Sequence, residues 1–153
     1  MRTLKKAVCI LSVVLILLSF TAFSALAFFG MIMASDDSVP KDEIIEFVNE
    51  HKDELEECAE NYDFSEFEGR GIVKSVYESG TCTEFSCGGR GLAGGSSYYC
   101  GFFYSPYDSR SAKWNGLPMH SYGDGFLYEE EFGDNKFYCE KIFDCFYYYE
   151  ESY

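Results

Sequence analysis

The chain has 153 residues, of which 26 are acidic and 12 are basic, and 19% of the residues are aromatic. Its formal net charge of −14 at pH 7 repels phosphate groups, so we do not expect nucleic acid as a partner. The aromatic content is well above that of a disordered acidic tail, which indicates a chain that folds.

The first element along the chain is an uncharged apolar run, Ala7–Ala34, which follows a basic region at residues 1–6. The run has 28 residues, and a helix of about 20 apolar residues crosses a bilayer. Basic residues beside such a helix stay on the cytoplasmic side. The sequence therefore predicts a single-pass anchor in the cell membrane, with the N-terminus in the cytoplasm and the C-terminal domain outside.

A cleaved signal peptide is the alternative interpretation of the same run. The residues Ala25-Leu26-Ala27 have the small-x-small pattern that signal peptidase recognises. Cleavage after Ala27 would give a secreted protein, but it would leave the apolar residues 28–34 at the new N-terminus. We therefore prefer the uncleaved anchor, and both interpretations place residues 35–153 outside the cytoplasm.

The charge of residues 35–153 restricts the partners of this part of the chain. All 26 acidic residues but only nine of the 12 basic residues lie there, which gives 9 − 26 = −17. Such a surface attracts cations. We expect a basic protein or peptide, or a cell-surface polymer, as the partner, and plain solubility is the alternative explanation of the charge.

The segment from about 40 to 60 has the pattern of an amphipathic helix. Ser38 and Pro40 suit the start of a helix, and acidic residues occupy most other positions. The apolar stripe recurs at steps of three and four and consists of Ile44, Val48, His51, Leu55, Cys58 and Tyr62. This helix and the connection that follows it make up residues 35–70.

From Gly71 onward the helical period is replaced by strand-like runs separated by turn residues. Gly133-Asp134-Asn135 is a good hairpin turn, and the loop-like stretch 106–125 holds Trp114 in a short strand. Strands joined by short turns are antiparallel. The predicted strands cover about 71–78, 81–87, 96–105, 125–131 and 136–150.

One helix ahead of an antiparallel β meander defines an α+β domain, with residues 35–70 and 71–153 in the same domain. We expect the helix stripe and one sheet face to bury each other. This order of elements resembles the cystatin-like layout, in which a curved sheet wraps one helix. The resemblance implies an architecture and no activity.

The stretch Gly89–Gly94 matches the pattern G-x-G-x-x-G. In dinucleotide-binding proteins this pattern opens a helix that holds a pyrophosphate. Here it leads into a predicted strand, so we expect no nucleotide cofactor. We interpret the stretch as a flexible hairpin loop, and Arg90 beside several tyrosines could border a binding cleft.

Aromatic residues occupy both faces of the predicted strands 96–105 and 136–150. One face is expected to be core, and the other could stack on a sugar ring or contact a partner. Cross-strand contacts among the aromatic residues are the alternative. The candidate binding surface consists of Arg90, Tyr98, Tyr99, Trp114, Tyr147 and Tyr149.

Six of the seven cysteines follow the apolar run, and an even number of cysteines outside the cytoplasm predicts disulfide bonds. Cys58, on the helix stripe, would join the helix to the sheet. The candidate disulfide cysteines are Cys58, Cys82, Cys87, Cys100, Cys139 and Cys145.

The predicted strands restrict how these cysteines pair. Cys82 and Cys87 share one strand, about 16 Å apart. Cys139 and Cys145 share another, about 20 Å apart, whereas a disulfide needs Cα atoms within about 7 Å. We therefore predict a Cys87–Cys100 bond across the glycine-rich stretch. The alternative joins Cys87 to Cys139 or Cys145.

Sequence patterns typical of catalysis or metal binding are missing from this chain. It has no G-x-S-x-G, no H-E-x-x-H, no close-spaced zinc ligands and no calcium loop. We therefore predict no catalytic residue, no cofactor and no metal. The sequence favours a membrane-anchored extracytoplasmic domain with a binding or interaction role. The alternative is a cell-wall enzyme or an enzyme inhibitor presented at the surface.

Overall fold

The computed structural model describes residues 36–91 and 96–153 of the chain. Residues 36–153 belong to one compact unit. No helix in the described part is long and apolar enough to cross a membrane. The predicted anchor Ala7–Ala34, with its alternative cleavage site at Ala27, lies outside the described residues.

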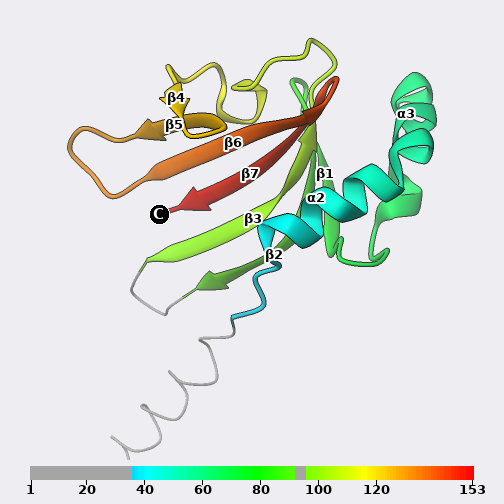
Figure 1. The fold of residues 1–153 in the computed structure, drawn as a ribbon, viewed down its shortest axis with the longest axis horizontal. Helices are drawn as coiled ribbons and strands as arrows, with labels where there is room; N and C mark the ends of the chain where they lie inside the picture. Colours follow the sequence, from blue (N-terminus) through cyan, green and yellow to red (C-terminus); the bar gives the residue numbers. More distant parts are fainter. Residues whose placement is uncertain (1–35, 92–95) are drawn as a thin grey trace, which may run out of the picture. The chain divides into compact units, whose positions relative to one another are not determined.

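The described residues form two α-helices and one seven-stranded antiparallel sheet, which confirms the α+β class (Figure 1). The helices are α2 (Lys41–Glu50) and α3 (Lys52–Asn61), with short 3-10 helices η1 (Ser65–Phe67) and η2 (Ala112–Trp114). The strands are β1 (Ser75–Glu78), β2 (Thr83–Gly91), β3 (Ser97–Tyr104), β4 (His120–Tyr122), β5 (Gly125–Glu129), β6 (Lys136–Phe143) and β7 (Phe146–Ser152).

The strand order β1-β2-β3-β7-β6-β5-β4 differs from the predicted simple meander. Two consecutive runs, β1 to β3 and β4 to β7, are joined because β7 pairs with β3. The difference arises within residues 136–150, which were predicted as one strand. They form the hairpin of β6 and β7, whose turn contains Cys145 at a φ of 67°. The predicted strand separation of Cys139 and Cys145 is therefore wrong.

The predicted helix 40–60 is divided at His51, where φ is −103° and ψ is 18°. The helix stripe is largely buried, as predicted, at Ile44, Val48 and Leu55. Tyr62 departs from the stripe because α3 ends there in a left-handed conformation, which leaves the tyrosine 69% exposed.

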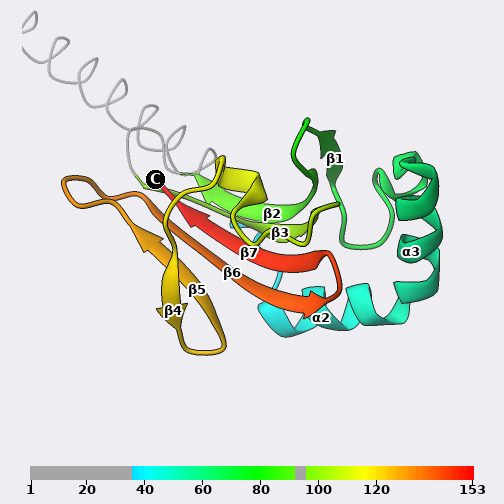
Figure 2. The same cartoon turned by 90° about the horizontal axis from the view of Figure 1, so that it is seen from above.

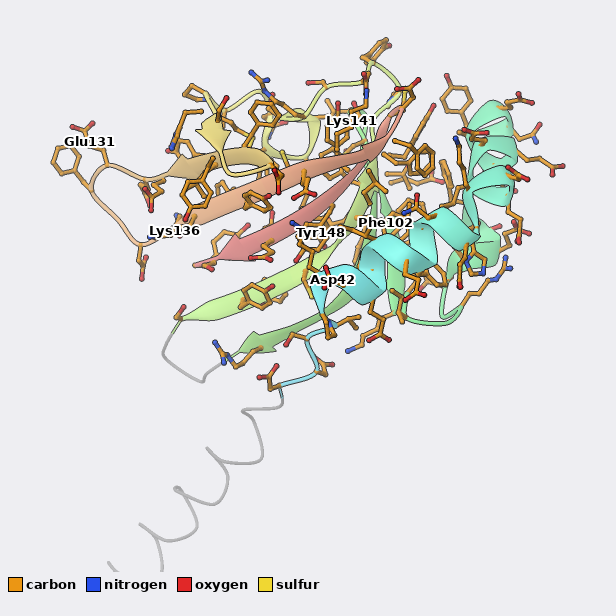
Figure 3. All side chains as sticks on the ribbon, viewed as in Figure 1. Asp42, Phe102, Glu131, Lys136, Lys141 and Tyr148 are labelled. Atoms are coloured by element: carbon orange, nitrogen blue, oxygen red, sulfur yellow. The ribbon has the colours of Figure 1, made fainter. Side chains whose placement is uncertain are left out.

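One hydrophobic core lies between the helices and the concave face of the sheet. Phe85 and Phe102 stack at its centre with their ring centroids 4.3 Å apart, and Phe64 meets Phe85 edge to face. Figure 3 places Phe102 and Tyr148 beside α2. The expected burial of the helix stripe against one sheet face is confirmed.

A second core covers the opposite face of the sheet, where the segment after β3 folds back over it (Figure 2). Trp114 stacks on Phe137 at 5.6 Å, and Phe103 stacks on Tyr147 at 5.2 Å. The prediction that Trp114 lies in a short strand is wrong, because this residue belongs to the 3-10 helix η2. The stretch predicted as loop also contains the short strand β4.

The glycine-rich stretch is also more regular than predicted. Gly89, Arg90 and Gly91 belong to β2, where Arg90 pairs with Tyr98 of β3, so the predicted hairpin loop is wrong for these residues. Residues 92–95 lie outside the described part. Gly89 is required by close approach, because a Cβ atom there would lie 2.4 Å from the carbonyl oxygen of Tyr98.

A buried ion network fixes η2 to the sheet. Lys113 Nζ lies 2.5 Å from Glu84 and 3.3 Å from Glu151. Trp114 Nε1 donates to Glu151 at 2.5 Å, and the Tyr149 hydroxyl donates to Glu84 at 2.7 Å. Burial and the neighbouring Glu84 raise the pKa of Tyr149 well above its usual value. If η2 left the sheet, Glu151 would lose its bonds to Lys113 and Trp114, and Glu84 would lose its cation but keep the bond from Tyr149.

We expect Lys113→Ala to lower the free energy of unfolding by about 3 kcal/mol, because it leaves buried Glu151 without its cation. Urea denaturation measures this loss. The control is Lys136→Ala, which removes an exposed ion pair with Glu129 and should cost less than about 1 kcal/mol. Equal losses in the two variants would contradict the role of the network.

Candidate functional site

The helix α2 covers only part of the concave sheet face, and a groove of about 410 Å³ remains open beside strands β4 to β7. We call it the sheet groove. Its lining mixes aromatic, charged and small polar side chains and consists of Lys41, Tyr122, Leu127, Glu129, Lys136, Tyr138, Glu150 and Ser152.

Strand register brings the base of the sheet groove together. Leu127 of β5 pairs with Tyr138 of β6, which in turn pairs with Glu150 of β7. Side chains at paired positions share a face. Gly125 makes room for the tyrosine ring, because a Cβ atom there would lie 2.6 Å from the Tyr138 hydroxyl oxygen.

Lys41, at the start of α2, closes one wall of the sheet groove. It forms an ion pair with Glu140, and its Nζ lies 5.6 Å from the centroid of the Tyr138 ring. The Tyr138 hydroxyl donates to the same carboxylate at 2.7 Å. Burial raises the pKa of Glu140, but the bonds from Lys41 and Tyr138 outweigh burial and leave this pKa below its usual value.

Glu150 is the carboxylate of the sheet groove that has no ion-pair partner among the described residues. It accepts a hydrogen bond from the Tyr148 hydroxyl at 2.5 Å. No lysine or arginine in the described part forms an ion pair with it, whereas Glu129 pairs with Lys136 at 2.6 Å. Burial and the charge of Glu150 raise the pKa of Tyr98 to about 12.

The structure separates the six residues of the predicted binding surface. Trp114, Tyr147 and Tyr149 are buried in the second core. Their rings therefore contribute mainly to packing, and only Tyr147 also borders a hollow, beside Asp108 and Lys141. The segment 105–119 covers this sheet face, which the sequence did not indicate.

The other three predicted residues remain at least partly accessible, in different places. Arg90 is exposed and lies 3.7 Å from Asp36. Tyr99 is 43% exposed. Tyr98 is half-buried and pairs with Ser152, which lines the sheet groove, so it is the one predicted residue that adjoins this site.

Sequence reasoning missed Lys41, Tyr138 and Glu150. Once 136–152 is divided into two strands, the alternation of side chains places Tyr138 and Glu150 on one face. No pattern in the sequence indicates that Lys41 meets Glu140, since these residues are 99 positions apart.

All six candidate disulfide cysteines carry free thiols in this structure. Cys87 and Cys100 lie on neighbouring strands and are fully buried, so the pairing of these two stays a prediction. Burial raises the pKa of every one of the six, to about 12 for Cys58 and Cys139. Thiols of this kind are protonated at neutral pH and are poor nucleophiles.

The described residues contain no group of three or more histidine, cysteine or carboxylate side chains placed to hold a metal ion. His51 lies between the helices, where its ring contacts Phe47 at 4.2 Å. His120 is exposed on β4. Neither histidine lines the sheet groove.

Comparisons of the chain with protein-family models, with curated proteins and with solved structures found no match.

We expect Glu140→Gln to lower the free energy of unfolding at pH 6. The variant should also lose less stability than the wild type as the pH falls from 6 to 3. The pKa of Glu140 is lower in the folded state than in the unfolded state. The stability that it contributes is thus complete above the unfolded pKa, about 4.3, and is lost as the pH falls through the folded pKa.

Urea denaturation between pH 6 and pH 3 measures this effect. The control is Glu131→Gln, at the exposed tip of the β5–β6 hairpin (Figure 3), which should follow the wild type. A Glu140→Gln variant with the wild-type pH dependence would contradict the role of the Lys41–Glu140–Tyr138 contacts.

Proposed function

We propose that the chain is a membrane-anchored extracytoplasmic binding domain whose ligand occupies the sheet groove. The observation that carries the proposal is the open groove beside α2 on the concave sheet face, lined by residues of β4 to β7. Ligand sites are typically concave, with aromatic walls and a few convergent polar groups. A helix that covers part of a curved sheet also supports the cystatin-like layout as the proposed architecture.

The charges of the domain favour a basic segment of a protein or peptide as the ligand. Eight of the nine basic residues in 36–153 form ion pairs, and the ninth, Arg110, stacks on Phe126 at 3.9 Å. The domain therefore has little positive charge to offer an anionic ligand. Glu150 supplies a free acceptor within the groove.

The surplus negative charge is concentrated on the two helices. Seven carboxylates on α2 and α3 are exposed and form no ion pair with described residues: Asp42, Glu43, Glu46, Glu50, Asp53, Glu57 and Glu60. A surface of one sign raises the local concentration of oppositely charged ligands and their rate of association. This surface would attract a basic peptide toward the neighbouring groove.

Binding is better supported than catalysis. A cell-wall hydrolase would need a pair of carboxyl groups around the bond that it cleaves, and Glu140 and Glu150 share the concave face. Glu140, however, is engaged by Lys41 and Tyr138. The thiols are protonated and no histidine lines the groove, so an activated nucleophile is missing from the described site.

The expected ligand can be tested with a fluorescein-labelled arginine-rich peptide and the full chain in lipid nanodiscs. Fluorescence anisotropy should show binding that weakens as salt is added. Glu150→Gln and Tyr122→Ala should each weaken binding about tenfold, because they remove a charge-assisted acceptor and an exposed ring of the groove.

The matched control is Tyr107→Ala, which removes an exposed tyrosine that does not line the groove. A glutamate-rich peptide of equal length should not bind. If Glu150→Gln and Tyr122→Ala bind the basic peptide as tightly as the wild type, the groove is not the ligand site.

The proposed topology is tested with an epitope after Tyr153 and a second epitope before Met1. Protease added to intact cells or spheroplasts should remove the C-terminal epitope and spare the N-terminal one. Protection of the C-terminal epitope until the cells are lysed would contradict the extracytoplasmic location.

A further inference from the structure

We propose that a second hollow in this domain binds the ring of a neutral sugar. The hollow has a volume of about 380 Å³ and lies where the end of α3, the β1–β2 turn and the segment after β3 meet. We call it the tyrosine cleft. It is lined by Tyr62, Ser79, Gly80, Thr81, Cys82, Thr83, Tyr104, Pro106 and Tyr107.

The lining of the tyrosine cleft carries no charged residue, although 25% of the chain is charged. The sheet groove contains two lysines and two glutamates. A hollow beside α3 contains Glu54 and Glu66, and another contains Asp108 and Lys141. An uncharged lining on so acidic a surface complements a ligand that is itself neutral.

The tyrosines give the cleft both a floor and a rim. Tyr104 is 8% exposed and is held by Phe64 and Phe146, whose ring centroids lie 5.3 Å and 5.1 Å away. Tyr107 and Tyr62 are 85% and 69% exposed. The apolar C–H face of a pyranose can stack on such rings, while its hydroxyl groups meet polar partners around the rim.

The backbone at Tyr62 is an independent sign of a functional role. Tyr62 ends α3 at a φ of 53°, a left-handed position that usually carries glycine or asparagine. A bulky residue is strained there, and this ring gains little packing in return because most of it is exposed. Strain of this kind gathers at ligand sites.

The β1–β2 turn supplies a fixed polar edge. The Ser79 hydroxyl accepts from the Cys82 backbone N–H at 3.1 Å and lies 3.2 Å from the Thr81 hydroxyl oxygen. These contacts hold the turn in one shape, so hydroxyl groups of serine and threonine stand beside the tyrosine rings. A neutral, hydroxyl-rich ligand can use both, and this favours a sugar over a proline-rich peptide, which offers fewer donors.

The cleft lies at the opposite end of β2 from the point where the described chain begins. Asp36, where the described chain begins, pairs with Arg90 near one end of β2. Thr83 lies at the other end of this strand, roughly 23 Å away at the usual rise per residue. Sugar binding in the cleft depends on neither the proposed anchor nor the sheet groove.

The test uses the full chain in lipid nanodiscs, with chitotetraose, cellotetraose and maltotetraose as neutral sugar probes. Decaproline represents the alternative class of ligand, a proline-rich peptide. Saturation-transfer difference NMR detects the contacts, and calorimetry gives the affinity. We expect a tetrasaccharide to bind. Tyr107→Ala and Tyr62→Gly should each weaken its affinity about threefold to tenfold, the range for losing one stacked ring.

The Tyr62→Gly variant should still fold, because glycine suits the left-handed position and should leave the thermal midpoint of unfolding unchanged or higher. A loss of affinity in this variant can therefore be assigned to the missing ring. Tyr122→Ala, in the sheet groove, should bind the sugar like the wild type. The proposal is overturned if none of the three tetrasaccharides binds, if both cleft variants keep wild-type affinity, or if only decaproline binds. Binding of the arginine-rich peptide depends on other residues, so the two proposals can fail separately.

Discussion

The pairing of β3 with β7 is the contact on which both cores and both proposed sites depend. Phe102 pairs with Tyr148, and Gly101 pairs with Tyr149, in the middle of the sheet. Gly101 allows the close approach of both neighbouring strands, because a Cβ atom there would lie 3.0 Å from the Tyr149 ring of β7 and 2.0 Å from the Phe85 carbonyl oxygen of β2. Side chains alternate between two buried faces along these strands, so the pairing positions the helix core and the η2 core together.

The uneven covering of this sheet explains where ligands could bind. Helix α2 contacts β3, β7 and β6 but does not cover β5 and the neighbouring part of β6, and the sheet groove forms there. At another part of the domain the end of α3 and the segment after β3 leave tyrosines exposed around an uncharged hollow. The two sites differ in charge, and this difference leads to a basic ligand for the first and a neutral ligand for the second.

The sequence was informative where one periodicity ran uninterrupted. The helical stripe through Ile44 and Leu55 and the switch to strand-like runs after Gly71 were enough to predict an α+β domain. The β6–β7 hairpin was missed because its turn, Asp144-Cys145, lies inside a run of aromatic residues without glycine, proline or asparagine. That omission hid the shared face of Tyr138 and Glu150, and long-range contacts such as Lys41 with Glu140 leave no local pattern at all.

The sheet groove is proposed to hold a basic ligand. Photo-crosslinking tests it most directly, with an arginine-rich peptide that carries a benzophenone group and mass spectrometry of the full chain to map the adducts. The account predicts adducts that concentrate on Tyr122, Leu127 and Tyr138. Adducts confined to the exposed faces of α2 and α3 would contradict it, since they would show attraction to the acidic helices without occupation of the groove.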